Sequence, residues 1–264
     1  MFSGNIGAVW NGTGGWRLAL NGSTGFRVPN IDDLGKVFDS QPGSVIVPNP
    51  DIKPEKTFNL DLNITRSIAD RVRWENVVWA TAQRDAIATD VFQFNGQDSI
   101  DYDGTPSRVL ANQNRRKANL WGFYSGIEAD LSNSLALFGS VNFTRGRIRE
   151  AETDGKPLDH IPPLHGRAGF RWHIPKASAE TFLLFNGKKR LEDYNTEGED
   201  NLQYAPPDGM PGWMTLNLRG SYRFHRMLAL QAGVDNILDT QYRAFASGIN
   251  APGRNFWVTL RLNW

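Results

Sequence analysis

Apolar residues recur at every second position in many segments of this chain, and this alternation constrains the fold more than any other feature. In the last segment the apolar residues of one parity are Phe256, Val258, Leu260, Leu262 and Trp264. A repeat of two residues puts alternate side chains on opposite faces of a β-strand, whereas a helix would scatter them around its circumference. The pattern therefore predicts strands with one apolar face and one polar face.

The same alternation recurs along the rest of the chain. The clearest further segments are 16–21, 58–65, 121–130, 135–144, 167–172, 215–219 and 228–235. Two segments are less regular, because 72–94 contains Val77-Val78-Trp79 and 179–190 contains four apolar residues in a row at 182–185. The chain thus predicts about eleven strands, of the ten-residue length or more that a tilted membrane strand needs.

The connections between these strands alternate between short and long. The short ones fall at 11–15, 68–71, 132–133, 174–178 and 225–226, and the long ones at 27–55, 95–112, 148–163, 191–212 and 238–254. All the short turns then lie at one end of the strands and all the long loops at the other, which is typical of outer-membrane barrels. A soluble β-sandwich also alternates, but its long loops should fall at both ends.

Tryptophan residues gather near the predicted strand ends. They are Trp10, Trp16, Trp74, Trp121, Trp172, Trp213, Trp257 and Trp264. Amphipathic rings favour the level of the lipid headgroups, where they form the two girdles of a membrane barrel. We therefore predict an all-β protein with an antiparallel transmembrane β-barrel fold and not a sandwich.

Composition excludes several other classes. The 264 residues carry a formal net charge of +1 and no cysteine, so neither bulk charge for nucleic acid nor a thiolate metal site is present. No run of 18 apolar residues predicts a transmembrane helix, and the N-terminal residues do not form a secretory signal. The motifs G-x-S-x-G, G-x-x-x-x-G-K-[ST] and H-E-x-x-H are missing, so we predict no enzyme and no catalytic residues.

Three stretches resemble the TonB-dependent receptor family. Residues Phe26-Arg27-Val28-Pro29-Asn30 and Asn49-Pro50-Asp51-Ile52-Lys53-Pro54-Glu55 are similar to two family boxes that flank an extracellular loop. The segments 155–158 with 161–163, and 233–239 with Tyr242 and 252–254, resemble the family's later boxes. The closing alternation that ends at Trp264 resembles the insertion signal read by the outer-membrane assembly machinery.

The resemblance implies energy-coupled uptake of a scarce nutrient, such as an iron–siderophore or haem complex, across the outer membrane of a Gram-negative bacterium. Residues 1–264 would be the C-terminal part of a barrel of about 22 strands. The implied partners are outer-membrane lipid, the assembly machinery, a small-molecule or metal-chelate ligand, and the TonB complex through an N-terminal region. A plug domain, a TonB box and a signal peptide are not among these residues, and half a barrel would leave two strand edges without partners in lipid. We therefore expect a fragment of a longer protein, or a chain that another polypeptide completes.

The resemblance also suggests which residues shape the outer ligand mouth. They are Phe26, Arg27, Pro29, Asn49, Pro50, Pro54, Glu55 and His160. His160 and His165 could bind haem iron or zinc, but a proline-rich loop end with incidental histidines explains them better. The acidic stretches 101–103 and 192–200 lack the spacing of an EF-hand, so solvated loops are favoured over calcium sites. No metal or cofactor is expected.

Two other functions are compatible with the same strands. The chain could belong to a passive outer-membrane pore or a surface adhesin, or it could be a barrel fragment that transports nothing. A plug domain and a TonB box upstream in the gene would favour the receptor.

The assignment of the apolar parity to lipid can be tested at Leu260. Replacing Leu260 with arginine should lower the free energy of unfolding by about 2–4 kcal/mol, because that is the cost of arginine on the lipid face at the bilayer midplane. Urea titration in phospholipid vesicles measures this difference. A negligible effect would contradict the assignment.

Overall fold

The fold is one large antiparallel sheet, described in a computed structural model for residues 2–41, 43–149, 155–158, 160–195, 200 and 204–262. Eleven strands follow one another in the sheet in chain order, each paired with its neighbour. They are β1 (Gly4–Asn11), β2 (Trp16–Arg27), β5 (Glu55–Ile68), β6 (Val72–Val91), β8 (Thr105–Asp130), β9 (Leu135–Ile148), β10 (His165–Ile174), β11 (Ala177–Asn186), β12 (Trp213–His225), β13 (Leu228–Asp235) and β14 (Asn255–Leu262). The predicted count and the antiparallel order are confirmed.

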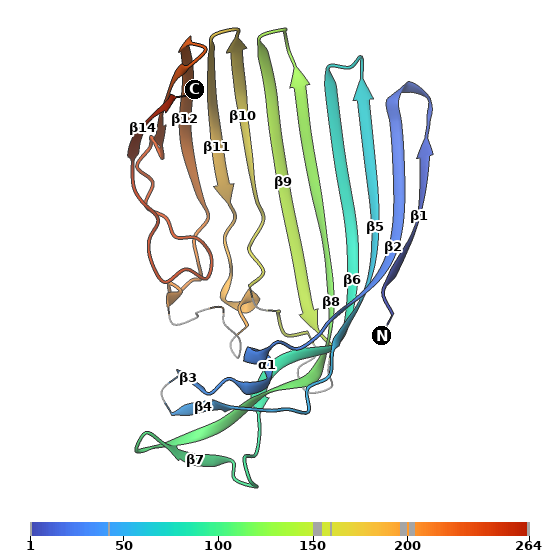
Figure 1. The fold of residues 1–264 in the computed structure, drawn as a ribbon, viewed down its shortest axis with the longest axis vertical. Coiled ribbons are helices and arrows are strands. Elements are labelled where there is room, and N and C mark those ends of the chain that lie inside the picture. The colour runs from blue at the N-terminus through green and yellow to red at the C-terminus, as the bar shows by residue number, and fades with distance from the viewer. Residues whose placement is uncertain are drawn as a thin grey trace.

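The strands stand side by side in a wall, with β1 and β14 at its two edges (Figure 1). The short turns lie at the top of this view, and the long connections lie at the bottom (Figure 1). This arrangement confirms the predicted separation of short turns from long loops. In the part of the chain that the structure describes, no helix is long and apolar enough to cross a membrane.

The pairing register builds one continuous apolar face. Directly opposed residues of an antiparallel pair lie on the same face. One row across five strands consists of Leu20, Leu62, Val78, Phe123 and Phe143. The next row consists of Asn21, Asp61, Trp79, Gly122 and Thr144, on the other face. A one-residue slip would exchange the two faces, so the alternation also fixes the register.

The closing strand β14 follows the same rule. Its Phe256, Val258, Leu260 and Leu262 are between 60 and 71% exposed and share one face. Each lies opposite a residue of the apolar parity of β13, for example Leu260 opposite Leu230. Trp264, the last residue of the predicted insertion signal, lies outside the described residues.

Aromatic side chains on the polar face explain why the alternation is irregular in 72–94 and 179–190. A Cβ added at Gly122 would lie 2.7 Å from the ring of Trp79, so the missing side chain leaves room for that ring. Phe182 is buried on the polar face, with the guanidinium carbon of Arg219 5.0 Å from its ring centre. These inward aromatic residues interrupt the alternation of the sequence without changing the pairing.

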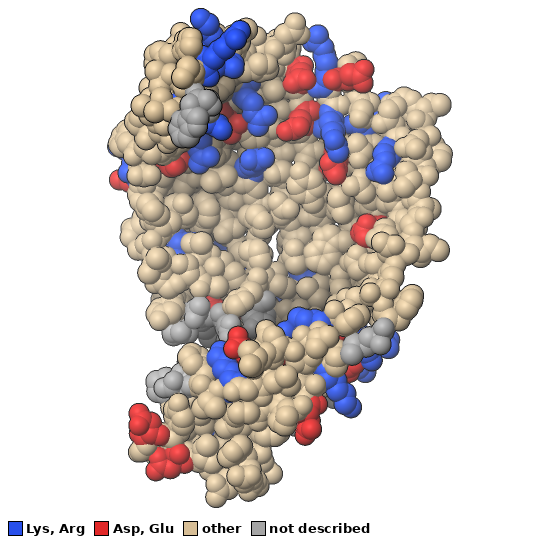
Figure 2. Space-filling model, viewed as in Figure 1, with Lys and Arg blue, Asp and Glu red and all other residues tan. Residues whose placement is uncertain are grey.

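Charged residues on the polar face concentrate toward the short turns. The upper part of Figure 2 shows lysine, arginine, aspartate and glutamate close together there, with a largely uncharged surface below them. Near the short turns, ion pairs join Arg73 to Glu75 at 3.1 Å and Arg171 to Glu180 at 2.9 Å, and farther from the turns Arg219 reaches Asp235 at 3.1 Å. A polar interior with compensated charges is what a water-filled barrel lumen requires.

At the long-loop end, two connections fold into a small extension of the sheet (Figure 1, bottom). It contains α1 (Ile31–Gly35), β3 (Phe38–Gln41), β4 (Ser44–Val47) and β7 (Ser99–Tyr102). β4 pairs in parallel with β8, and β7 pairs with β8 in antiparallel fashion. Val45, Val47, Val109 and Ala111 form its buried core. The loops predicted at 27–55 and 95–112 therefore contain strands.

Candidate ligand mouth

The two family-like boxes meet in one ion-paired group at the long-loop end of β2 and β5. We call this group, which consists of Arg27, Asp33 and Glu55, the latch. Arg27 Nε donates to Glu55 Oε2 at 2.6 Å, and Arg27 Nη1 donates to Asp33 Oδ2 at 2.6 Å. The other carboxylate oxygen of Glu55 accepts from the backbone N–H of Ile87 at 2.7 Å. The hydrogen bond that Arg27 donates to Glu55 raises the pKa of Arg27 above its ordinary value, and burial acts in the opposite direction. One buried carboxylate thus joins β2, β5 and β6.

The second box contacts both the end of α1 and β8, and the Asn49 N–H donates to the Leu34 carbonyl at 3.0 Å. Asn49 is buried; its amide donates to the Asn112 carbonyl at 2.8 Å and its oxygen accepts from the Asp51 N–H at 3.2 Å. Asn30 and Asp33 form a capping box at the start of α1. The Asn112 amide of β8 donates in turn to the Asp33 carbonyl at 3.2 Å, so Asn49 and Asn112 hold the 28–54 connection against β8.

The structure brings some of the predicted mouth residues together and separates others. Arg27, Asn49 and Glu55 belong to the latch region, where Pro29 and Pro54 are half-buried and Phe26 and Pro50 are exposed. His160 lies in a different loop, where its backbone N–H donates to Asp200 at 2.6 Å. A ligand contact for each of these eight residues remains a prediction.

A second group of residues, which the sequence did not reveal, joins three long loops. Lys189 is 5% exposed and donates to the Ile161 carbonyl at 2.6 Å, while Asp200 is fully buried and accepts from the N–H groups of His160 and Asn195. The Lys189 ammonium also lies 4.4 Å from the ring centre of Phe245. Burial lowers the pKa of Lys189, and the negative charge of Asp200 opposes this shift. We call this group the loop node.

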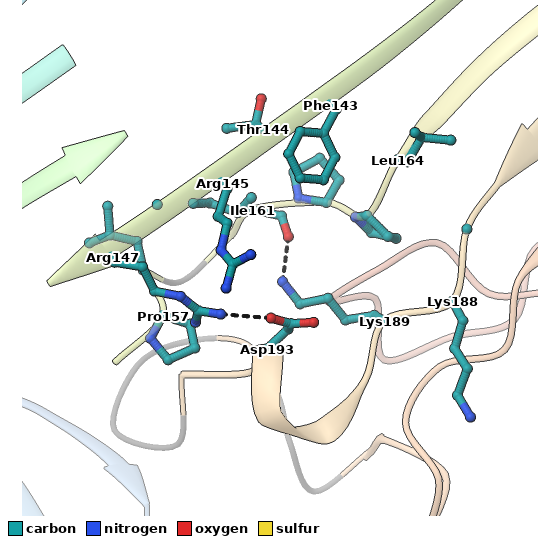
Figure 3. A pocket seen from close by; sticks show the side chains of 15 residues that line it. Phe143, Thr144, Arg145, Arg147, Pro157, Ile161, Leu164, Lys188, Lys189 and Asp193 are labelled. Atoms are coloured by element: carbon teal, nitrogen blue, oxygen red, sulfur yellow. Dashed lines mark hydrogen bonds and ion pairs between the residues drawn. The ribbon is translucent and has the colours of Figure 1, made fainter. Parts of the chain in front are cut away.

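Beside the loop node lies a cleft in the rim of the wall (Figure 3). β9 pairs with β10 only from Leu135 to Asn142 but continues to Ile148, and the cleft of about 220 Å³ lies next to this extension. Its apolar lining includes Phe143, Leu158, Ile161 and Leu164. Figure 3 shows Arg145, Arg147 and Lys189 around the cleft, and the dashed lines mark the bonds from Arg147 to Asp193 and from Lys189 to Ile161.

Cations outnumber carboxylates at this rim. A hollow that shares part of the lining is bordered by Arg145, Arg147, Arg149, Arg190, Glu192 and Asp193. Arg147 reaches Asp193 at 2.9 Å and Arg190 reaches Glu192 at 3.2 Å, while Arg145 is exposed and makes no ion pair with any described residue. We call the residues around these two hollows the cationic cleft. Guanidinium groups bind carboxylates and other anionic oxygens through strong, charge-assisted hydrogen bonds.

One sequence signal could have pointed to this cleft. Arginine stands at alternate positions 145, 147 and 149, where the apolar parity of β9 ends. Cations of one parity at the loop end of a strand indicate a charged rim.

The described residues hold no group of three histidine, aspartate or glutamate side chains that could bind a metal ion.

The latch should control the order of the 28–54 connection. Replacing Glu55 with alanine removes the acceptor of two hydrogen bonds, one from a cation, at a cost of about 1.5–3 kcal/mol. Chymotrypsin should then cleave the connection, for example after Phe38, about ten-fold faster or more.

Lys56→Ala is the matched control, since Lys56 is the exposed neighbour with only a 3.6 Å contact to Asp85. Its cleavage rate should equal that of the unmodified protein. Unchanged cleavage of Glu55→Ala would show that the latch does not hold the connection.

Comparison with known proteins places this geometry in a family. The family model described as "TonB dependent receptor-like, beta-barrel" matches residues 1–237. The iron-regulated outer membrane virulence protein of Vibrio cholerae serotype O1 is 22% identical over 98% of this chain and 39% of its own length. Transferrin-binding protein A of Neisseria meningitidis serogroup B is 26% identical over 94% of this chain and 30% of its own length.

Solved structures show the same fold. The copper transporter OprC superposes with a TM-score of 0.77 at 22% identity, over 98% of this chain and 39% of that one. The ferric enterobactin receptor of Pseudomonas aeruginosa superposes with a TM-score of 0.76 at 20% identity, over 98% of this chain and 40% of that one. This chain therefore spans about two fifths of the length of these structures.

These matches indicate a family of receptors and not of enzymes, located in the outer membrane of Gram-negative bacteria. They confirm the resemblance carried by the boxes at 26–30 and 49–55. The chain belongs to the TonB-dependent receptor-like β-barrel family.

Proposed function

We propose that residues 1–264 are the C-terminal barrel portion of a receptor that takes up an anionic metal chelate, such as an iron–siderophore complex, with energy from the TonB complex. The observation that carries this proposal is the cationic cleft at the long-loop end, where Arg145 is exposed and has no ion-pair partner among the described residues. The apolar lining beside it suits the organic part of such a chelate.

The names of the relatives support a metal-bearing ligand. They include an iron-regulated protein, a transferrin-binding protein, a haemoglobin–haptoglobin utilisation protein and a ferric enterobactin receptor. A haem complex is also compatible, because haem carries carboxylate groups that arginine can bind. The mouth residues predicted from the two boxes and His160 would shape the approach to this cleft.

Transport would need more strands than the sheet contains. In the described part of the chain β1 and β14 pair on one side only, and a strand edge is not tolerated in lipid. We propose that further strands, a plug domain and the TonB-contacting region come from the rest of a longer protein or from a second polypeptide. The exposed apolar face of β14 would be the part read by the outer-membrane assembly machinery.

The cationic cleft can be tested by uptake. In cells that express the whole gene containing this chain, Arg145→Ala together with Arg147→Ala should reduce uptake of radiolabelled ferric enterobactin or haemin at limiting concentration by about ten-fold or more. The expected loss follows from removing charge-assisted hydrogen bonds, each worth about 1.5–3 kcal/mol.

Two controls separate binding from folding. Arg226→Ala changes an exposed arginine in a short turn at the opposite end and should leave uptake unchanged. Arg145→Lys with Arg147→Lys keeps both charges and should retain part of the uptake. Full uptake of both ligands by the alanine variant, at an unchanged surface level, would remove the cleft from the ligand path.

A further inference from the structure

The lipid-facing side of the wall carries one charged residue among tryptophans at the short-turn end. Arg66 of β5 lies directly opposite Trp16 of β2 and Trp74 of β6 in the pairing register. All three therefore share the apolar face, which the family assignment turns toward the bilayer. A charged side chain on this face is costly at the bilayer midplane and is tolerated near the lipid headgroups.

The protein supplies Arg66 with a ring but no carboxylate. Its guanidinium carbon lies 4.7 Å from the centre of the Trp16 ring, a cation–π contact. A Cβ added at Gly14 would lie 3.3 Å from Arg66 Nη1, so the turn before β2 leaves space for the guanidinium. Among the described residues, no aspartate or glutamate forms an ion pair with Arg66.

A second donor lies one row deeper on the same face. Asn76 is opposite Ile64 and Ser125, and its side-chain oxygen accepts from Ser125 Oγ at 2.7 Å. Its Nδ2 atom is enclosed and has no hydrogen-bond acceptor in the protein. The Trp74 indole donates to the same Ser125 hydroxyl at 3.3 Å. The Asn76 side chain therefore has one donor that a ligand oxygen could satisfy if the amide rotates toward the apolar face.

The height of these residues matches the lipid headgroups. On β5 and β6, the row of Arg66 and Trp74 lies near the short turn, with the row of Ile68 and Val72 beyond it, and the row of Lys56 and Arg84 lies at the other end of the apolar face. The rows of Trp74 and Arg84 are ten residues apart on β6, or about 34 Å along the strand and about 26 Å along the normal for a tilt near 40°. This separation equals the apolar height of an outer-membrane barrel, so Arg66 lies at the headgroup level of the leaflet beside the short turns.

We propose that Arg66, Trp16, Trp74 and Asn76 form a binding site for the phosphate and glycerol region of one phospholipid in that leaflet. The phosphodiester anion accepts hydrogen bonds from the Arg66 guanidinium between the two indoles. The Asn76 amide, after a small rotation, donates to an ester oxygen one row deeper. The acyl chains then lie along the apolar rows of β5 and β6, which a free phosphate ion could not use.

Native mass spectrometry of the detergent-purified protein with added palmitoyl-oleoyl phosphatidylglycerol tests this site. The unmodified protein should retain one lipid under conditions where Arg66→Gln retains about ten-fold less, since the lost charge-assisted bond is worth about 1.4 kcal/mol or more. Asn76→Leu, which keeps the charge and the apolar surface, should reduce retention less than Arg66→Gln. Arg226→Ala, an exposed short-turn arginine, should bind like the unmodified protein.

Three results would overturn the proposal. The first is equal retention of phosphatidylglycerol by Arg66→Gln and by the unmodified protein. The second is that the unmodified protein retains dioleoyl glycerol, which has no phosphate, as well as it retains phosphatidylglycerol. The third is displacement of the lipid by millimolar inorganic phosphate. The last would assign the site to free phosphate. The heat-dependent gel mobility of Arg66→Gln shows whether this variant folds. If it does not fold, Asn76→Leu is the deciding variant. Lipid retention by Asn76→Leu equal to that of the unmodified protein then counts against the site. None of these readouts depends on nutrient uptake.

Discussion

The need to pair every backbone N–H and C=O group away from water is the constraint on which this structure depends. In a bilayer these groups find no water, so a strand is stable there only between two neighbours. The chain meets this need with eleven consecutive antiparallel strands, each hydrogen-bonded to the next along the chain. Within the described part of the wall, the two edge strands β1 and β14 each pair on one side.

Once the pairing is set, the faces of the wall follow from the register. The row from Leu20 to Phe143 is apolar and the neighbouring row from Asn21 to Thr144 faces the lumen. The two proposed sites lie where the apolar parity ends. At the long-loop end, Arg145 and Arg147 follow Phe143 and border the cationic cleft. At the short-turn end, Arg66 lies between two tryptophans at the other headgroup level.

The sequence predicted the wall well because a period of two is a local signal. It placed the short turns, the long loops and the alternation of apolar and polar faces, and even the irregular 77–79 segment keeps its register, since Trp79 fills the space above Gly122. The extension at the loop end could not be predicted in this way. Its β4 strand pairs with β8, more than 60 residues later, and no local pattern specifies such a parallel pair.

The candidate site was predictable only in part. The boxes around Arg27 and Glu55 were identified, yet their partner Asp33 and the bond to Ile87 depend on the folded loop. The loop node around Lys189 and Asp200 brings together three loops that are distant in sequence, so spacing gave no sign of it. The arginines at 145, 147 and 149 did carry a signal in their alternation. That these arginines border a cleft depends on the folded loops beside them.

The central claim is that one face of the wall contacts lipid and the other does not. The most direct test is to measure the oxygen accessibility of adjacent positions on two central strands. The chain has no cysteine, so each of four variants can carry one introduced cysteine with a nitroxide label. The labelled positions are 77 and 78 on β6, and 61 and 62 on the neighbouring strand β5. In lipid vesicles, labels at 78 and 62 should collide preferentially with dissolved oxygen, which concentrates in the bilayer. Labels at 77 and 61 should collide less with oxygen. Equal oxygen accessibility at adjacent positions, or the opposite alternation, would contradict the assignment of the two faces.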